Sequence, residues 1–67
     1  MSRSTLTSKA NRAIDAAQRG GALVDRIEAD EGCALSTVLD GLWAEADEQG
    51  IPELSARLER AYNRLTG

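Results

Sequence analysis

The stretch DEQGIPELSARL, residues 47–58, joins two runs of helically spaced apolar residues, and it decides how those runs are connected. Gly50 suits the left-handed conformation that ends many α-helices, and Ile51 after it can fold back on Ala46, as in a Schellman motif. Pro52 cannot extend the preceding helix, but it fits the first turn of a new one. The stretch therefore predicts a sharp corner at Gly50–Pro52 between two helices.

Both flanks of this corner are amphipathic. Residues 36–49 are predicted to form a helix that Ser36 or Thr37 caps at its N-terminus. Apolar residues occupy an arc of about 140° on this helix, and they are Leu35, Val38, Leu39, Leu42, Trp43 and Ala46, with Asp40, Ala44, Asp47 and Glu48 opposite. After the corner, apolar residues again recur at intervals of three and four residues. They are Ile51, Leu54, Leu58, Ala61 and Leu65, with Tyr62 beside them. The spacing from Glu53 to Arg57 predicts an ion pair across one helical turn. The two helices are expected to form an antiparallel hairpin.

The same corner has a second interpretation, as the turn of a DNA-reading helix-turn-helix. Ala46, Gly50 and Ile51 match the small residue, the turn glycine and the apolar position that this motif prefers. The same register also requires apolar residues at positions 49, 56 and 59, which here hold glutamine, alanine and glutamate. The acidic helix before the corner would moreover repel a phosphate backbone. A plain corner is the better interpretation.

The N-terminal part carries one apolar stripe with heptad-like spacing. It consists of Leu6, Ala10, Ala13, Ala17, Gly20, Val24 and Ile27. The unbroken stripe favours one helix from about Thr7 to Asp30, closed by Gly32. Gly20 and Gly21, however, cost about 2 kcal/mol together inside a helix. The alternative is a helix that ends near Arg19 and a second that begins at Ala22. Whether residues 1–6 are ordered stays open.

The apolar core is small, and this predicts a partner chain. The 67 residues include 16 large apolar side chains, and small domains often add a disulfide, a metal or a second copy. The lone Cys33, expected to be a small buried filler, excludes an internal disulfide, and the lack of histidine removes the usual zinc sites. The sequence therefore predicts a single all-α domain over residues 1–67, a three-helix domain whose first helix is long or broken at Gly20–Gly21, assembling as a dimeric helical bundle. Candidate interface positions are Leu6, Ala10, Ala13, Ala17, Gly20, Val24, Trp43 and Tyr62. For Trp43 and Tyr62 core packing is the favoured role, and an interface is the alternative.

Charge divides the chain into a basic start, an acidic middle and a basic end. Residues 1–20 carry four basic and one acidic side chain, residues 21–53 one basic and nine acidic, and residues 54–67 three basic and one acidic. This pattern permits complementary packing within or between chains, and it permits a nucleic-acid surface. The candidate nucleic-acid contacts are Arg12, Arg19, Arg57, Arg60 and Arg64.

No catalytic motif is present, and neither histidine nor a phosphate-binding glycine loop occurs. We therefore expect no enzyme activity, no cofactor and no bound metal. No apolar segment has the length of a membrane span, so a cytoplasmic location is expected, with an organelle transit peptide as the alternative for the basic N-terminus. The function expected is that of a small non-catalytic interaction or regulatory protein, which binds another protein through amphipathic helix surfaces and self-associates as a homodimer. The alternative is a dimeric DNA- or RNA-binding regulator.

Overall fold

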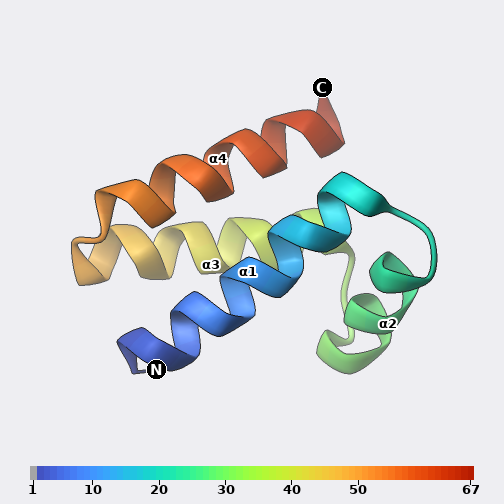
Figure 1. The fold of residues 1–67 in the computed structure, drawn as a ribbon, viewed down its shortest axis with the longest axis horizontal. Coiled ribbons are helices and arrows are strands. Elements are labelled where there is room, and N and C mark those ends of the chain that lie inside the picture. The colour runs from blue at the N-terminus through green and yellow to red at the C-terminus, as the bar shows by residue number, and fades with distance from the viewer. Residues whose placement is uncertain (1) are drawn as a thin grey trace.

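The computed structural model describes residues 2–67 and folds them into four α-helices without strands (Figure 1). The helices are α1 (Arg3–Arg19), α2 (Ala22–Glu31), α3 (Leu35–Gln49) and α4 (Pro52–Thr66). α3 and α4 form an antiparallel hairpin, α1 lies across both, and the short α2 packs against α1 and α3. The all-α prediction is confirmed for the described residues. The predicted count of three helices is wrong, because the first segment divides.

The division lies at Gly20 and Gly21, whose φ angles are +69° and +64°. Residues other than glycine rarely adopt such angles, so the two glycines turn the chain rather than continue the helix. The backbone N–H of Gly20 still donates to the carbonyl of Ala16 over 2.7 Å, which closes α1. The continuous helix to Asp30 is therefore wrong, and the alternative of a break between Arg19 and Ala22 is correct.

The start of α1 also differs from the expectation. The helix begins at Arg3, four residues before Thr7, because the Ser2 hydroxyl accepts a hydrogen bond from the backbone N–H of Thr5 at 3.1 Å. A serine in this position satisfies one of the free N–H groups of the first turn. Residues 2–6 are thus part of the fold, while Met1 lies outside the described residues.

The turn between α2 and α3 was predicted in part. Gly32 ends α2 in the left-handed conformation, with φ 73° and ψ 21°, as expected. α3 begins at Leu35, and neither Ser36 nor Thr37 caps it. The carboxylate of Glu28 instead accepts the backbone N–H of Leu35 over 2.7 Å. The predicted cap is wrong because a side chain seven residues earlier already satisfies the first turn.

The corner between α3 and α4 is confirmed. Gly50 is left-handed, with φ 70° and ψ 43°, and Pro52 opens α4. The N–H of Gly50 donates to Asp47 and the N–H of Ile51 to Ala46, which is the hydrogen-bond pattern of a Schellman motif. The two helices then lie side by side and antiparallel (Figure 1), unlike a helix-turn-helix, whose helices meet at about 90–120°.

The core lies where α1 crosses the hairpin. Its largest fully buried side chains come from three helices, and they are Leu6, Leu35, Leu39 and Leu58. Small residues such as Ala10, Ala16 and Ala46 are also buried and let the helices approach closely. Among the described residues, Leu65 is the large apolar side chain that stays exposed, at 40%. A single chain therefore covers almost all of its apolar stripes.

Candidate interaction site

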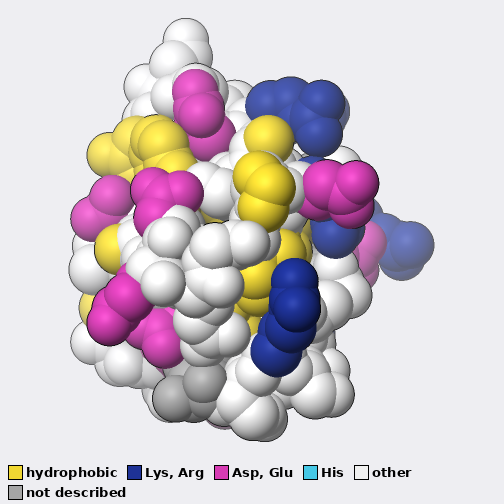
Figure 2. Space-filling view, turned by 90° about the vertical axis from the view of Figure 1, so that its left-hand side faces the viewer, with side chains coloured by type: hydrophobic (Ala, Val, Ile, Leu, Met, Phe, Trp, Pro, Cys, Tyr) yellow, Lys and Arg dark blue, Asp and Glu magenta, His cyan; other side chains and the backbone are white. Residues whose placement is uncertain are grey.

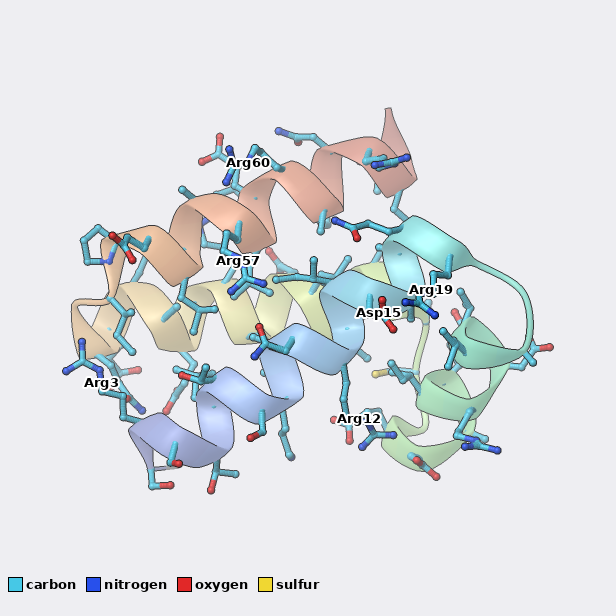
Figure 3. The ribbon with its side chains drawn as sticks, viewed as in Figure 1. Arg3, Arg12, Asp15, Arg19, Arg57 and Arg60 are labelled. Carbon is cyan, nitrogen blue, oxygen red and sulfur yellow. The ribbon has the colours of Figure 1, made fainter. Side chains whose placement is uncertain are left out.

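A groove between α1 and α4 is lined by three arginines of α4. We name it the arginine groove, and its lining residues are Ile14, Gln18, Arg57, Arg60, Ala61 and Arg64. Figure 3 shows Arg57 reaching from α4 into the space beside α1, with Arg60 further along the same helix. The groove continues along α1 past Asn11, Arg12 and Asp15. Its walls are thus polar or charged along its whole length.

The floor of the arginine groove is apolar and narrow. Ile14 from α1 and Ala61 from α4 line it, and they are only 6% and 5% exposed. Most of their apolar surface is already used between the two helices. Ligand binding in this groove must therefore depend on charge and hydrogen bonding more than on apolar burial.

Among the residues that the structure describes, the arginines of α4 form no ion pair. Within residues 2–67, Arg57, Arg60 and Arg64 make neither an ion pair nor a hydrogen bond through their side chains. The ion pair predicted between Glu53 and Arg57 is not formed, so that prediction is wrong. Three guanidinium groups, each a rigid fork of donors for an oxyanion, are left to water or to a ligand.

Two of the three arginines of α1 are engaged in ion pairs instead. Arg12 approaches Asp30 of α2 at 3.5 Å, and Arg19 approaches Asp15 at 2.9 Å. Asp15 is about half exposed and the other three side chains are more exposed, so these ion pairs stabilise little and mainly lower the local positive charge. Of the five arginines predicted as nucleic-acid contacts, the structure brings together the three on α4, with Arg12 at the far end of the groove and Arg19 outside its lining.

A separate acidic surface follows the outer face of α3. We name it the acidic ridge, and it consists of the exposed residues Asp40, Ala44, Asp47 and Glu48. Figure 2 shows most of the acidic side chains on its left-hand side and the basic ones on its right. The charge pattern along the sequence thus becomes a charge pattern between two faces of the fold.

The predicted interface stripe serves another purpose. Leu6, Ala10 and Ala13 are buried in the core of the chain itself, at 1% exposure or less, and present no surface to a second chain. Ala17 and Val24 are half-buried against the same core. Gly20 forms the turn after α1. The stripe therefore packs α1 and α2 onto the hairpin.

The two aromatic residues share one edge of the hairpin. The rings of Trp43 and Tyr62 are tilted by 52°, with centroids 6.1 Å apart, and both side chains are half-buried against the core. Such tilted pairs are favourable beyond their buried area. Trp43 and Tyr62 therefore contribute to packing, and their exposed edges leave part of each ring accessible.

No group of three or more His, Cys, Asp or Glu side chains that could hold a metal ion is found among residues 2–67. Cys33, expected to be buried, is exposed in the turn between α2 and α3, because that turn lies outside the core. No helix in this part of the chain has both the length and the apolar character that a bilayer span requires.

The α1 side of the arginine groove was missed from the sequence. The groove is lined on this side by Asn11, Ile14 and Gln18, which follow one another at intervals of three and four residues on α1. This spacing is visible in the sequence, next to the apolar stripe that is predicted as an interface.

Comparisons with protein-family models, curated proteins and solved structures find no match to this chain.

Proposed function

We propose that this chain is a small non-catalytic interaction protein that holds an acidic segment of a protein chain in its arginine groove. The observation that carries the proposal is the set of three arginines on α4 that have no ion-pair partner within residues 2–67, next to an α1 wall that includes the amides Asn11 and Gln18. Charge-assisted hydrogen bonds from arginine to carboxylate are among the stronger polar contacts in proteins.

The spacing of these arginines favours a helical ligand. Arg57 and Arg64 are seven residues apart, which places them two turns or about 10 Å apart along α4. Carboxylates seven residues apart on a second helix have the same separation. An acidic helix that lies along the arginine groove can therefore meet both arginines at once.

A nucleic acid is the second candidate ligand. The same unpaired arginines, together with Asn11 and Gln18, can contact phosphates. The net charge of −3 and the acidic ridge oppose this alternative, since the molecule as a whole repels a polyanion at long range. A short acidic peptide carries fewer charges and meets less of this repulsion.

Fluorescence anisotropy of dilute protein with labelled ligands tests the proposal. The ligands are a helical peptide with glutamates seven residues apart, its scrambled version, and single- and double-stranded oligonucleotides. We expect the first peptide to bind best. Substitution of Arg57→Glu with Arg64→Glu should weaken its binding at least about tenfold, because two attractions become repulsions.

The matched control is Arg3→Glu with Arg26→Glu, which makes the same change in net charge at two exposed sites outside the arginine groove. The control should retain most of the binding. Equal losses in both variants would mean that overall charge, rather than the groove, attracts the peptide. Tighter binding of an oligonucleotide than of the peptide would replace the proposal with the nucleic-acid candidate.

A further inference from the structure

We infer that the acidic segment that fits the arginine groove is the acidic ridge of a second copy of this chain, so that copies associate head to tail; this inference rests on the proposed function. The argument depends on three features of the two surfaces: their spacing, their lack of intramolecular ion pairs and their placement on the fold.

The two surfaces have the same spacing with opposite charge. On α4 the groove presents Arg57, Ala61 and Arg64, and on α3 the ridge presents Asp40, Ala44 and Asp47. Each set follows the pattern charge, alanine, charge at intervals of four and three residues. The charges at both ends are therefore about 10 Å apart on each helix. Between the charges, Ala44 is small and exposed on the ridge, whereas Ala61 is only 5% exposed on the floor of the groove.

Both surfaces are also free to pair. Within residues 2–67, the carboxylates of Asp40, Asp47 and Glu48 form no ion pair, like the three arginines of the groove. Asp47 accepts a hydrogen bond from Ser55 through Oδ1, which leaves Oδ2 for another donor. The two surfaces thus carry equal and opposite charge, and the seven-residue pairs Asp40–Asp47 and Arg57–Arg64 share one spacing.

The placement of the surfaces determines the kind of assembly. The ridge lies on the exposed face of α3, whereas the apolar face of α3 packs toward α1 and α4. In the view of Figure 2, the basic side chains lie on the right and most of the acidic ones on the left. A contact between unlike surfaces is heterologous and leaves one groove and one ridge open at the ends. The expected product is a chain of copies that grows with concentration, in place of a closed two-fold dimer.

Sedimentation velocity over increasing protein concentration, with no peptide added, tests this inference. Exposed ion pairs are individually weak, so association is expected as the concentration approaches roughly 1 mM at low salt. The weight-average sedimentation coefficient should then rise steadily without reaching a dimer plateau. It should return to the monomer value in about 1 M NaCl, where the Debye length is only about 3 Å.

Two charge-reversal variants, one of the groove and one of the ridge, distinguish this contact from non-specific association. The groove variant carries Arg57→Glu and Arg64→Glu, which changes the charge of its three arginine positions from +3 to −1. The ridge variant carries Asp40→Arg and Glu48→Arg, which changes the three acidic positions from −3 to +1 and keeps the bond from Asp47 to Ser55. Each variant alone should stay monomeric. An equimolar mixture should associate again, because each surface then meets its opposite.

Two substitutions with an uncharged residue test whether the facing helix packs closely against the acidic ridge. Ala44→Gln enlarges the centre of the ridge, and Ala29→Gln makes the same change on the exposed face of α2. The first should suppress association and the second should not. Circular dichroism of every variant confirms that it is folded before it is compared.

Three results would overturn the inference: a wild-type chain that stays monomeric at low salt, association that persists in the groove variant, or variants that fail to associate when mixed. If the acidic peptide binds to the groove while the chain remains monomeric, the proposed function stands and the second copy is excluded as its ligand. If neither occurs, both proposals fail.

Discussion

The carboxylate of Glu28 in α2 accepts a hydrogen bond from the backbone N–H of Leu35 over 2.7 Å, so α2 supplies the cap for α3. Without it, an N–H group in the first turn of α3 would lack a protein partner, since Ala34 precedes the helix and has no polar side chain. The contact also ties α2, whose one buried residue is Ile27, to the hairpin.

Substitution of Glu28→Ala should therefore lower the free energy of unfolding by about 0.5–2 kcal/mol, as loss of an N-terminal cap does. In a domain of this size, this corresponds to a fall in Tm of roughly 2–16 °C, measured by circular dichroism. Glu31→Ala, at an exposed position of the same helix, is the control and should change little. Equal effects of the two substitutions would show that the cap contributes nothing specific.

The hairpin has a second side-chain bond, between its two helices. The hydroxyl of Ser55, nearly buried in α4, donates to Oδ1 of Asp47 in α3 over 2.5 Å. Ser55→Ala should destabilise the chain by about 0.5–1.5 kcal/mol, because the hydrogen bond is lost. The higher helix propensity of alanine offsets part of this loss.

A double-mutant cycle with Asp47→Ala isolates the bond from these other effects. Chemical denaturation of the wild type, both single variants and the double variant gives the coupling energy. We expect a coupling of about 0.5–1.5 kcal/mol in favour of the pair. Strictly additive losses would show that Ser55 and Asp47 act independently of each other.

The parts of the fold that depend on neighbouring residues were predictable from the sequence. The corner at Gly50–Pro52 is an example, since the glycine, the apolar residue and the proline each favour the same geometry. The cap of α3 was not predictable in this way. It depends on Glu28 coming back to Leu35 across a turn, whereas the local serine and threonine gave a competing and incorrect signal.

The break after α1 shows why a periodic stripe alone is insufficient. The stripe continues through Gly20 because α2 also turns an apolar face to the core, so the same spacing fits one helix or two. Only the positive φ angles of Gly20 and Gly21 decide between them. The arginine groove was half predictable: the arginines of α4 share a stripe in the sequence, but their α1 neighbours depend on how α1 crosses the hairpin.

Substitution of two leucines by alanine should lower the stability by very different amounts. Leu39 is fully buried in the centre of the fold, whereas Leu65 is 40% exposed near the end of α4. Leu39→Ala should cost about 2–5 kcal/mol, a large part of the stability of a small domain, and Leu65→Ala should cost less than about 1 kcal/mol. Urea denaturation measures both. A mild effect at Leu39 would show that the core is loosely packed around this residue.

Two glycine substitutions should change stability in opposite directions. Gly20 has φ +69° and ψ −161°, a conformation that other residues adopt only at a cost of about 1–3 kcal/mol, so Gly20→Ala should lower Tm. Gly41 lies exposed inside α3, and a β-carbon there would meet no atom within 4 Å. Gly41→Ala should therefore raise the stability by about 0.5–1 kcal/mol, because alanine favours the helix and restricts the unfolded chain. Thermal denaturation followed by circular dichroism compares the two. A stabilising effect of Gly20→Ala, with increased helix content, would mean that α1 and α2 join into one continuous helix in solution.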